Sequence, residues 1–360
     1  MEFNFTDIII LILGLTLFGF EVLILKFVKK KTVSLSQTAL NLGLGMLERL
    51  TGILTINFGI YVFSSLVPFR FFEPLDNKWL AFGITFIAVD FMWYIYHRIS
   101  HRVSLIWAAH LIHHQSIEYN FSVNFAISPF GFFVRIFTYS ILILFGITPE
   151  HIILANALNA FYQYMLHSEL WPEFKGWERI LVTPKFHQIH HSSVHEHLDT
   201  NYGGMFTIWD RLFGTYYVDE KEVVYGLTKP IAQRDPFHLQ ILFFLRLIKN
   251  FQEFPFFKAF ILLFKGPEAQ KAEIPRLYNL KVQHSPFQVI FGFSLFLVGF
   301  SVISFDLLPI WLGFIIGMIG IFICSGIRFR QNFNDNYLLI IKSNKLVLFI
   351  KSLFQHVVQK

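Results

Sequence analysis

Residues 90–101 read DFMWYIYHRISH, a stretch that joins an apolar run to two closely spaced histidines. The apolar run extends from 79 to 96 and is long enough for a helical membrane span, which needs about 17–25 mostly apolar residues. It leads directly into His97 and His101. Histidines at positions i and i+4 lie on one face of a helix and can bind one metal ion together. The stretch therefore predicts a membrane helix that ends in part of a metal site.

The composition of the 360-residue chain is that of an integral membrane protein. Hydrophobic residues make up 54% and charged residues 15%, whereas a soluble globular domain carries about 25% charged residues. These values exclude a disordered chain, a nucleic-acid-binding module and an ordinary cytosolic enzyme. We expect an all-α fold, a multi-pass bundle of transmembrane helices.

Other apolar runs predict further helices in or at the membrane. Additional spans are expected at 6–25, 50–66, 287–305 and 308–327. Two shorter runs, at 130–145 and 152–166, are joined by a tight turn and predict a helical hairpin. A run at 238–264 is interrupted by charged residues and Pro255, which favours an interfacial amphipathic helix over a span.

The distribution of Lys and Arg predicts the orientation of the chain. Basic residues gather after the last predicted span and between the first two, at Lys26, Lys29, Lys30, Lys31 and Arg49. Because cytoplasmic loops are enriched in Lys and Arg, we expect the N-terminus outside, the C-terminus inside and the histidine-rich segments on the cytosolic side. The expected organisation is N-terminal spans (1–78), a catalytic domain (79–217), a cytosolic or interfacial segment (218–286), and C-terminal spans with a basic tail (287–360).

Eight histidines form three clusters with helical spacing. They are His97 and His101; His110, His113 and His114; and His187, His190 and His191. Imidazole is a common ligand of iron, copper, zinc and nickel. Eight imidazoles exceed the three or four protein ligands of a single zinc site. The number therefore predicts a two-metal centre with open positions for oxygen or substrate.

Two further polar features point to the same centre. His167 ends a polar stripe of Asn156, Asn159 and Gln163, spaced by three or four residues. We expect His167 to be a ninth ligand, the alternative being a polar seam that holds helices together. Asp90 lies two helical turns before His97 in an apolar run, where a carboxylate is usually functional. We expect Asp90 either to hydrogen-bond a ligating imidazole or to hold helices together.

The remaining histidines are expected to lie outside the metal site. His195 and His197 occur in a charged stretch that predicts a solvated loop. Four others, His151, His238, His284 and His356, are isolated in the sequence and are expected to be structural.

The order and the flanks of the clusters resemble the fatty acid hydroxylase/sterol desaturase superfamily. The flanks are DFMWYIYHRISH at 90–101, LIWAAHLIHHQS at 105–116 and NYGGMFTIWDRLFGT at 201–215, and the HSE at 167–169 matches an isolated histidine of the family. The surrounding spans look most like the alkylglycerol monooxygenase branch. The resemblance implies two iron ions held by the nine histidines, with Asn201 and Asp90 supporting the ligands. It also implies a cytosolic-side di-iron centre that uses O2 to hydroxylate or desaturate a lipid.

The resemblance also implies partners and leaves rivals open. The reductant is expected to be external, since no haem or flavin motif is present; tetrahydrobiopterin, used in part of the family, is one candidate. We expect lipid and O2 as partners, no nucleic acid, and a membrane-embedded chain whose oligomeric state stays open. The rival functions are a sterol or carotenoid oxidase of the same superfamily and, from another class, a histidine-rich membrane metal transporter. Transporters place their ligands near the bilayer midplane, whereas these clusters are predicted at the cytosolic ends of helices.

Overall fold

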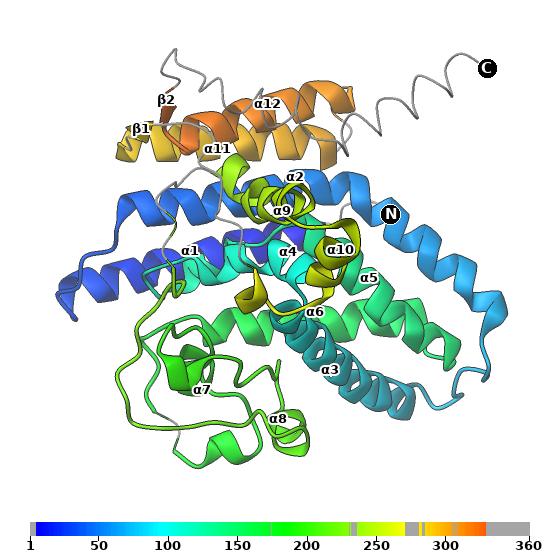
Figure 1. Ribbon diagram of the computed structural model, residues 1–360. Coiled ribbons are helices and arrows are strands. Elements are labelled where there is room, and N and C mark those ends of the chain that lie inside the picture. Colours follow the sequence, from blue (N-terminus) through cyan, green and yellow to red (C-terminus); the bar gives the residue numbers. More distant parts are fainter. Residues whose placement is uncertain are drawn as a thin grey trace.

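The computed structural model describes residues 5–173, 175–229, 231, 236–270, 281–282, 285–304, 307 and 309–328. In these ranges the chain is almost entirely helical, so the predicted all-α fold is confirmed (Figure 1). The α-helices are α1 (Phe5–Phe27), α2 (Leu35–Leu66), α3 (Lys78–Arg102), α4 (Ser104–His114), α5 (Pro129–Leu144), α6 (Pro149–Leu166), α7 (Pro184–His190), α8 (Ile208–Leu212), α9 (Pro236–Glu253), α10 (Phe256–Phe264), α11 (Pro286–Ser304) and α12 (Ile310–Cys324). Short 3-10 helices are η1 (Val67–Phe69), η2 (Phe121–Phe125), η3 (Trp177–Arg179), η4 (His195–His197) and η5 (Pro267–Ala269). Strands β1 (Lys281–Val282) and β2 (Ile327–Arg328) pair antiparallel.

Two of the described helices are long and apolar enough to cross a membrane. They are α3 and the segment Pro286–Ile303 of α11, which confirms the expected spans at 79–96 and 287–305. A bent pair, Leu35–Gly52 with Asn57–Phe69, is a third candidate, so the run at 50–66 belongs to a longer, broken helix. The run at 308–327 forms α12, whose 15 residues are short for a span. The basic tail, His284 and His356 lie outside the described residues.

A glycine-lined contact joins α11 to α12. A Cβ atom added to Gly313 would lie 2.7 Å from the carbonyl oxygen of Gly299, and one added to Gly320 would lie 2.6 Å from that of Gly292. Real Cβ atoms do not approach main-chain oxygens so closely, so the two backbones pack directly against each other. Small residues permit this close approach between membrane helices.

The interior of the bundle is built from α3, α4, α5 and α6. The predicted hairpin is present as α5 and α6, and a buried cluster that includes Val89, Ile136 and Ile152 packs the hairpin against α3. On the other side, Leu40, Ile112 and Leu239 join α4 to α2 and α9. The histidine-bearing helices are therefore fixed from both sides by apolar packing.

The interfacial segment differs from the single helix expected at 238–264. It forms two helices, α9 and α10, that are separated at Pro255. Proline lacks the main-chain N–H of a continuing helix and disfavours helical geometry in the residue before it, which explains the break. The helix α9 packs on α4 and α2, while α10 leaves Phe256 and Phe257 exposed.

Candidate metal centre

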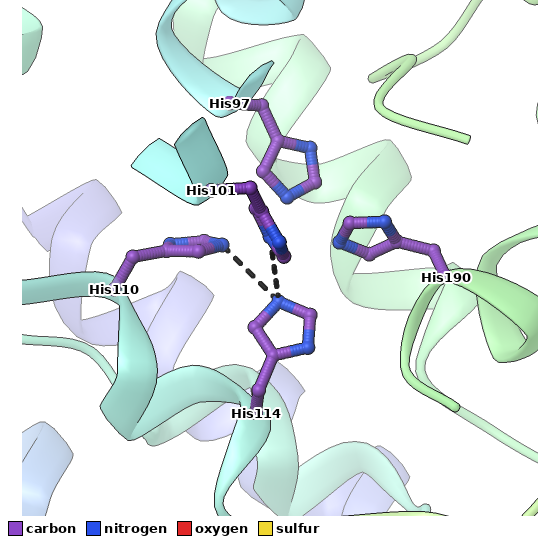
Figure 2. A group of neighbouring side chains, drawn as sticks. All are labelled: His97, His101, His110, His114 and His190. Atoms are coloured by element: carbon purple, nitrogen blue, oxygen red, sulfur yellow. Dashed lines mark hydrogen bonds between the residues drawn. The ribbon is translucent and has the colours of Figure 1, made fainter. Parts of the chain in front are cut away.

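The nine predicted histidines come together in two adjacent groups. The five-histidine group contains His97, His101, His110, His114 and His190, and Figure 2 shows their imidazoles converging on a common centre. The four-histidine group contains His113, His167, His187 and His191. Within each group the candidate ligand nitrogens lie within 4.8 Å of one another. Each group thus has the size and the donor set of a metal site.

The two HxxHH segments are divided between the groups in opposite ways. On α4, His110 and His114 join the five-histidine group and His113 joins the other. At α7 the outer pair, His187 and His191, joins the four-histidine group, while His190 crosses to the five-histidine group. Residues i and i+4 lie on one face of a helix, whereas residue i+3 is displaced to the other side of residue i. Each segment can therefore serve two neighbouring centres.

The distances between imidazole nitrogens fit shared coordination. In the five-histidine group, His114 Nε2 lies 3.1 Å from His101 Nε2 and 3.2 Å from His110 Nε2. In the four-histidine group, His167 Nε2 lies 3.1 Å from the Nε2 atoms of His113 and His187. Nitrogens bound about 2.0–2.1 Å from one metal ion, at right to tetrahedral angles, are separated by about 2.9–3.4 Å.

Several Nε2 atoms of the groups also have no protein partner. The Nε2 atoms of His97, His190 and His191 are buried and accept or donate no hydrogen bond among the described residues. A buried polar atom without a partner is costly. A cation in each group would satisfy these nitrogens, so the residues fit two metal ions.

Main-chain carbonyls orient the imidazoles. The Nδ1 atom of His97 pairs with the carbonyl oxygen of Tyr202 at 2.9 Å, and that of His190 pairs with the carbonyl oxygen of Thr200 at 2.8 Å. The Nδ1 atom of His167 pairs with the carbonyl oxygen of Gln163 at 2.7 Å. Because a carbonyl only accepts, each Nδ1 carries the proton and the Nε2 lone pair is free for a metal, as is usual for ligating histidines.

Burial keeps the imidazoles in the form that binds metals. It lowers the pKa of His110 to about 3 and that of His190 to about 4, in both cases mainly because a charged imidazolium would lose its hydration. Both side chains are therefore neutral near pH 7. A neutral imidazole is the species that coordinates a metal ion.

Asp90 supports the centre through a loop rather than through an imidazole. Its buried carboxylate accepts hydrogen bonds from Asn159 Nδ2 and Met205 N, both at 2.7 Å, and from Trp209 Nε1 at 2.9 Å. Phe206 N donates a fourth at 3.2 Å. No imidazole of the described residues bonds it. Asp90 was expected either to bond a ligating imidazole or to hold helices together. Its contacts are of the second kind, because they join α3 to α6 and to the loop that carries Tyr202.

Asn201 connects α7 to the segment that follows the loop. Its side-chain amide donates to the carbonyl oxygens of Phe186, at 3.1 Å, and Tyr217, at 2.7 Å, while its oxygen accepts from Tyr217 N at 2.8 Å. Its φ of 61° is left-handed, a conformation that asparagine tolerates better than most residues. Phe186 precedes His187, so Asn201 fixes the start of the third histidine cluster.

Two buried carboxylates near the centre were not identified from the sequence. Asp210 accepts hydrogen bonds from Tyr202 N and Gly203 N at 2.7 and 2.8 Å. Glu21 of α1 accepts from Phe121 N at 2.7 Å and from the hydroxyl of Ser168, the residue after His167. Each is an acidic residue inside an apolar stretch, which is the same sequence signal that singles out Asp90.

The solvated loop expected at His195 and His197 is only partly correct. His195 is exposed, as expected. His197 is fully buried, and its Nε2 lies 3.1 Å from Asp219 Oδ1, an ion-pair geometry that the sequence spacing of 22 residues does not suggest. Among the described residues neither joins a histidine group.

A small cavity lies beside both histidine groups. Its volume is about 50 Å³, and its lining comes from α3 to α7 and η2 and includes His97 and His110 of one group and His113, His167 and His187 of the other. Trp93 also lines it and has a buried Nε1 without a hydrogen-bond partner in the described chain. The arrangement gives a bound molecule direct access to both candidate metal positions.

Comparison with known proteins agrees with this geometry. Residues 82–215 match the model of the fatty acid hydroxylase family. This segment belongs to that family. The match begins in α3 and ends after α8, so it contains all nine histidines of the two groups.

The similar curated proteins support the alkylglycerol monooxygenase branch. The human alkylglycerol monooxygenase is 36% identical over 210 residues, which are 58% of this chain and 46% of that protein. The Danio rerio alkylglycerol monooxygenase is 31% identical over 260 residues, 68% of this chain and 57% of that protein. An ornithine lipid hydroxylase of Rhizobium tropici is 28% identical over 148 residues, 39% of this chain and 44% of that protein. The chain spans about half the length of these relatives, and no solved structure matches it.

Proposed function

We propose that the protein is a membrane-bound lipid monooxygenase whose two histidine groups each hold one iron ion. The observation that carries this proposal is the convergence of nine imidazoles, eight buried and one half-buried, into two adjacent groups within a fatty acid hydroxylase segment. An all-imidazole donor set is compatible with iron, and two neighbouring sites beside one cavity suit O2-dependent chemistry. Iron bound there would supply the activation of O2 for attack on an unactivated C–H bond of the substrate.

The chain itself holds the metals, positions the lipid and excludes water. The Tyr202 and Thr200 carbonyls fix the imidazoles of His97 and His190, so the ligands need little rearrangement when metal binds. The lipid carbon to be oxidised would occupy the cavity beside both groups, within the apolar bundle of α3 to α6. The similar proteins include alkylglycerol monooxygenases and an ornithine lipid hydroxylase. A lipid substrate is the class they share.

The proposal includes a reductant and an orientation. Monooxygenation needs two electrons per O2, so an external reductant completes the reaction. The concentration of Lys and Arg between α1 and α2 favours a cytosolic position of the histidine groups. An exposed cysteine introduced at Lys175, which lies between α6 and α7, should react with a membrane-impermeant maleimide in inside-out vesicles and not in right-side-out ones.

Purified protein in lipid nanodiscs tests the function. After anaerobic loading with ferrous iron we expect about two iron ions per chain. O2 uptake should require both a reductant and a lipid extract, and mass spectrometry should detect lipids that have gained one oxygen atom. The exposed His195→Ala variant is a matched control that should keep the iron and the activity. Metal flux into liposomes without O2 uptake would instead favour the transporter and contradict the proposal.

A further inference from the structure

A second, larger cavity lies outside the metal centre. It is a groove of about 300 Å³ between α3, η3 and α8, and none of the nine histidines lines it. Its walls are apolar: Ile87, Ile180, Phe206, Ile208 and Trp209. Two arginines, Arg179 and Arg211, complete the lining. The groove therefore has a hydrocarbon-like surface, to which the two arginines contribute mainly their apolar stems while their charged ends are exposed.

The apolar walls of this groove are open to the surroundings. Ile180 is 67% exposed, Ile208 is 55% exposed and Ile87 is 45% exposed. Large exposed apolar patches mark surfaces that contact a partner or a membrane. Ile87 belongs to α3, one of the helices able to cross a membrane, and the exposed side of α3 continues through Ile84 and Leu80. The groove thus continues the surface that α3 presents to lipid, which makes a lipid the occupant.

The two arginines are available for an anionic group. The Arg211 guanidinium lies 3.9 Å from the centre of the Tyr216 ring and donates to the carbonyl oxygen of Glu178 at 3.5 Å, which holds its plane in place. In the ranges that the structure describes, neither Arg179 nor Arg211 forms an ion pair with a carboxylate. Planar guanidinium groups bind phosphate oxygens with two parallel hydrogen bonds.

We propose that the groove binds one anionic phospholipid, with its phosphate at Arg179 and Arg211 and an acyl chain along the isoleucines. The site is separate from the proposed oxygenase reaction and does not depend on metal. It has a consequence for the metal centre, because Trp209 of the groove donates its Nε1–H to Asp90. A bound lipid would brace the loop whose carbonyls orient His97 and His190.

Thermal unfolding of the delipidated, metal-free full chain in detergent tests the site. Phosphatidylglycerol should raise the Tm of the parent chain more than phosphatidylcholine does, and inorganic phosphate should leave it unchanged. In the Arg179→Gln/Arg211→Gln variant we expect phosphatidylglycerol to bind about tenfold more weakly or worse, because two charge-assisted contacts are lost. Arg179→Gln alone, which leaves the Arg211 stack intact, should lose part of the response.

A charge-matched control and a second readout complete the test. Lys175→Gln removes a positive charge from the same exposed segment without touching the groove, and it should respond like the parent chain. Native mass spectrometry should detect one retained phospholipid on the parent chain and on Lys175→Gln, and less on the double variant. An equal response to both phospholipids, a response to inorganic phosphate alone, or an unchanged response in the double variant would each overturn the proposal.

Discussion

The two histidine groups lie side by side and share α4 and α7, but their imidazoles are held differently. In the five-histidine group, His97 and His190 bond to carbonyls of the loop at 200–202. In the four-histidine group, His167 bonds to Gln163 of its own helix, and the Nδ1 atom of His187 is buried without a partner in the described residues. One group therefore depends on a distant loop, and the other depends mainly on the ends of its own helices.

The difference assigns separate roles to two residues that touch no imidazole. Asp90 fixes the loop at 205–206 and so supports the five-histidine group. Asn201 bonds to Phe186, directly before His187, and lies between Thr200 and Tyr202, whose carbonyls orient His190 and His97, so it supports both groups. Loss of Asp90 should therefore affect the two metal sites unequally, whereas loss of Asn201 should affect both. The expected effects can be ordered from largest to smallest.

Removing one ligand from each group should have the largest effect. Loss of an outer hydrogen-bond partner alone costs about 10–100-fold in affinity or activity, so His167→Ala and His101→Ala should each lower lipid oxidation by at least about 100-fold. Their iron contents should differ, because His167→Ala leaves three imidazoles and His101→Ala leaves four. We expect His167→Ala to lose one of about two iron ions and His101→Ala to keep most of its iron. Iron analysis of the purified variants, with His195→Ala as control, measures this difference in iron content. Equal losses of iron would mean that the fifth histidine of the five-histidine group does not help to retain its metal.

Removing the carboxylate of Asp90 should come next. Asp90→Ala leaves one buried and three half-buried donors without an acceptor, which should lower the free energy of unfolding by about 4–6 kcal/mol. Asp90→Asn retains one acceptor oxygen and should lose less. At a temperature where Asp90→Asn is folded, metal spectroscopy should show that the five-histidine site changes more than the four-histidine site, which Asp90 reaches only through Asn159 and Gln163. The same change at both sites would contradict the division of support.

The sequence predicted the nine histidines because their information is local. A spacing of three or four residues fixes which side chains share a helix face, whatever the rest of the fold does. It did not predict that α4 and α7 divide their histidines in opposite ways, since this depends on how the two helices cross. It also did not predict the partners of Asp90, which lie 115 and 116 residues away at Met205 and Phe206. Glu21 carries the same local signal as Asp90, an acidic residue in an apolar run, but its partner Ser168 lies 147 residues away and cannot be read from the sequence.

Asn201 offers a way to separate backbone strain from side-chain bonding. Asn201→Ala should lower the free energy of unfolding by about 3–4 kcal/mol, since it removes three hydrogen bonds and strains a left-handed residue. Asn201→Gly removes the same bonds but tolerates the positive φ, so it should be about 1 kcal/mol less destabilising. Denaturant unfolding of the two variants measures the difference. Equal stabilities would show that the conformation at this position is not strained.

The carboxylate of Asp210 should make stability depend on pH. Burial raises the pKa of Asp210 from 3.8 to about 6, so between these values the unfolded chain releases a proton that the folded chain retains. Stability contributed by this group is present below about pH 4 and is lost as the pH rises through 6, by roughly 2–3 kcal/mol. Asp210→Asn does not titrate and should lack this slope. Tm values of the two metal-free chains, measured from pH 4 to 7, isolate the contribution of Asp210 because the histidines contribute equally to both chains. Parallel Tm curves would show that Asp210 does not have a raised pKa.

His197 should show the smallest effect, and only on stability. It is buried and paired with Asp219, yet it belongs to neither histidine group. His197→Gln can still donate to Asp219 and should be nearly neutral, whereas His197→Ala leaves that contact empty and should lower the free energy of unfolding by about 1–2 kcal/mol. Neither variant should change the iron content, in contrast to His190→Ala seven positions earlier in the chain. Loss of iron in His197→Ala at a temperature where the protein is fully folded would contradict this prediction. It would mean that His197 contributes to metal binding and not only to the stability of the segment around it.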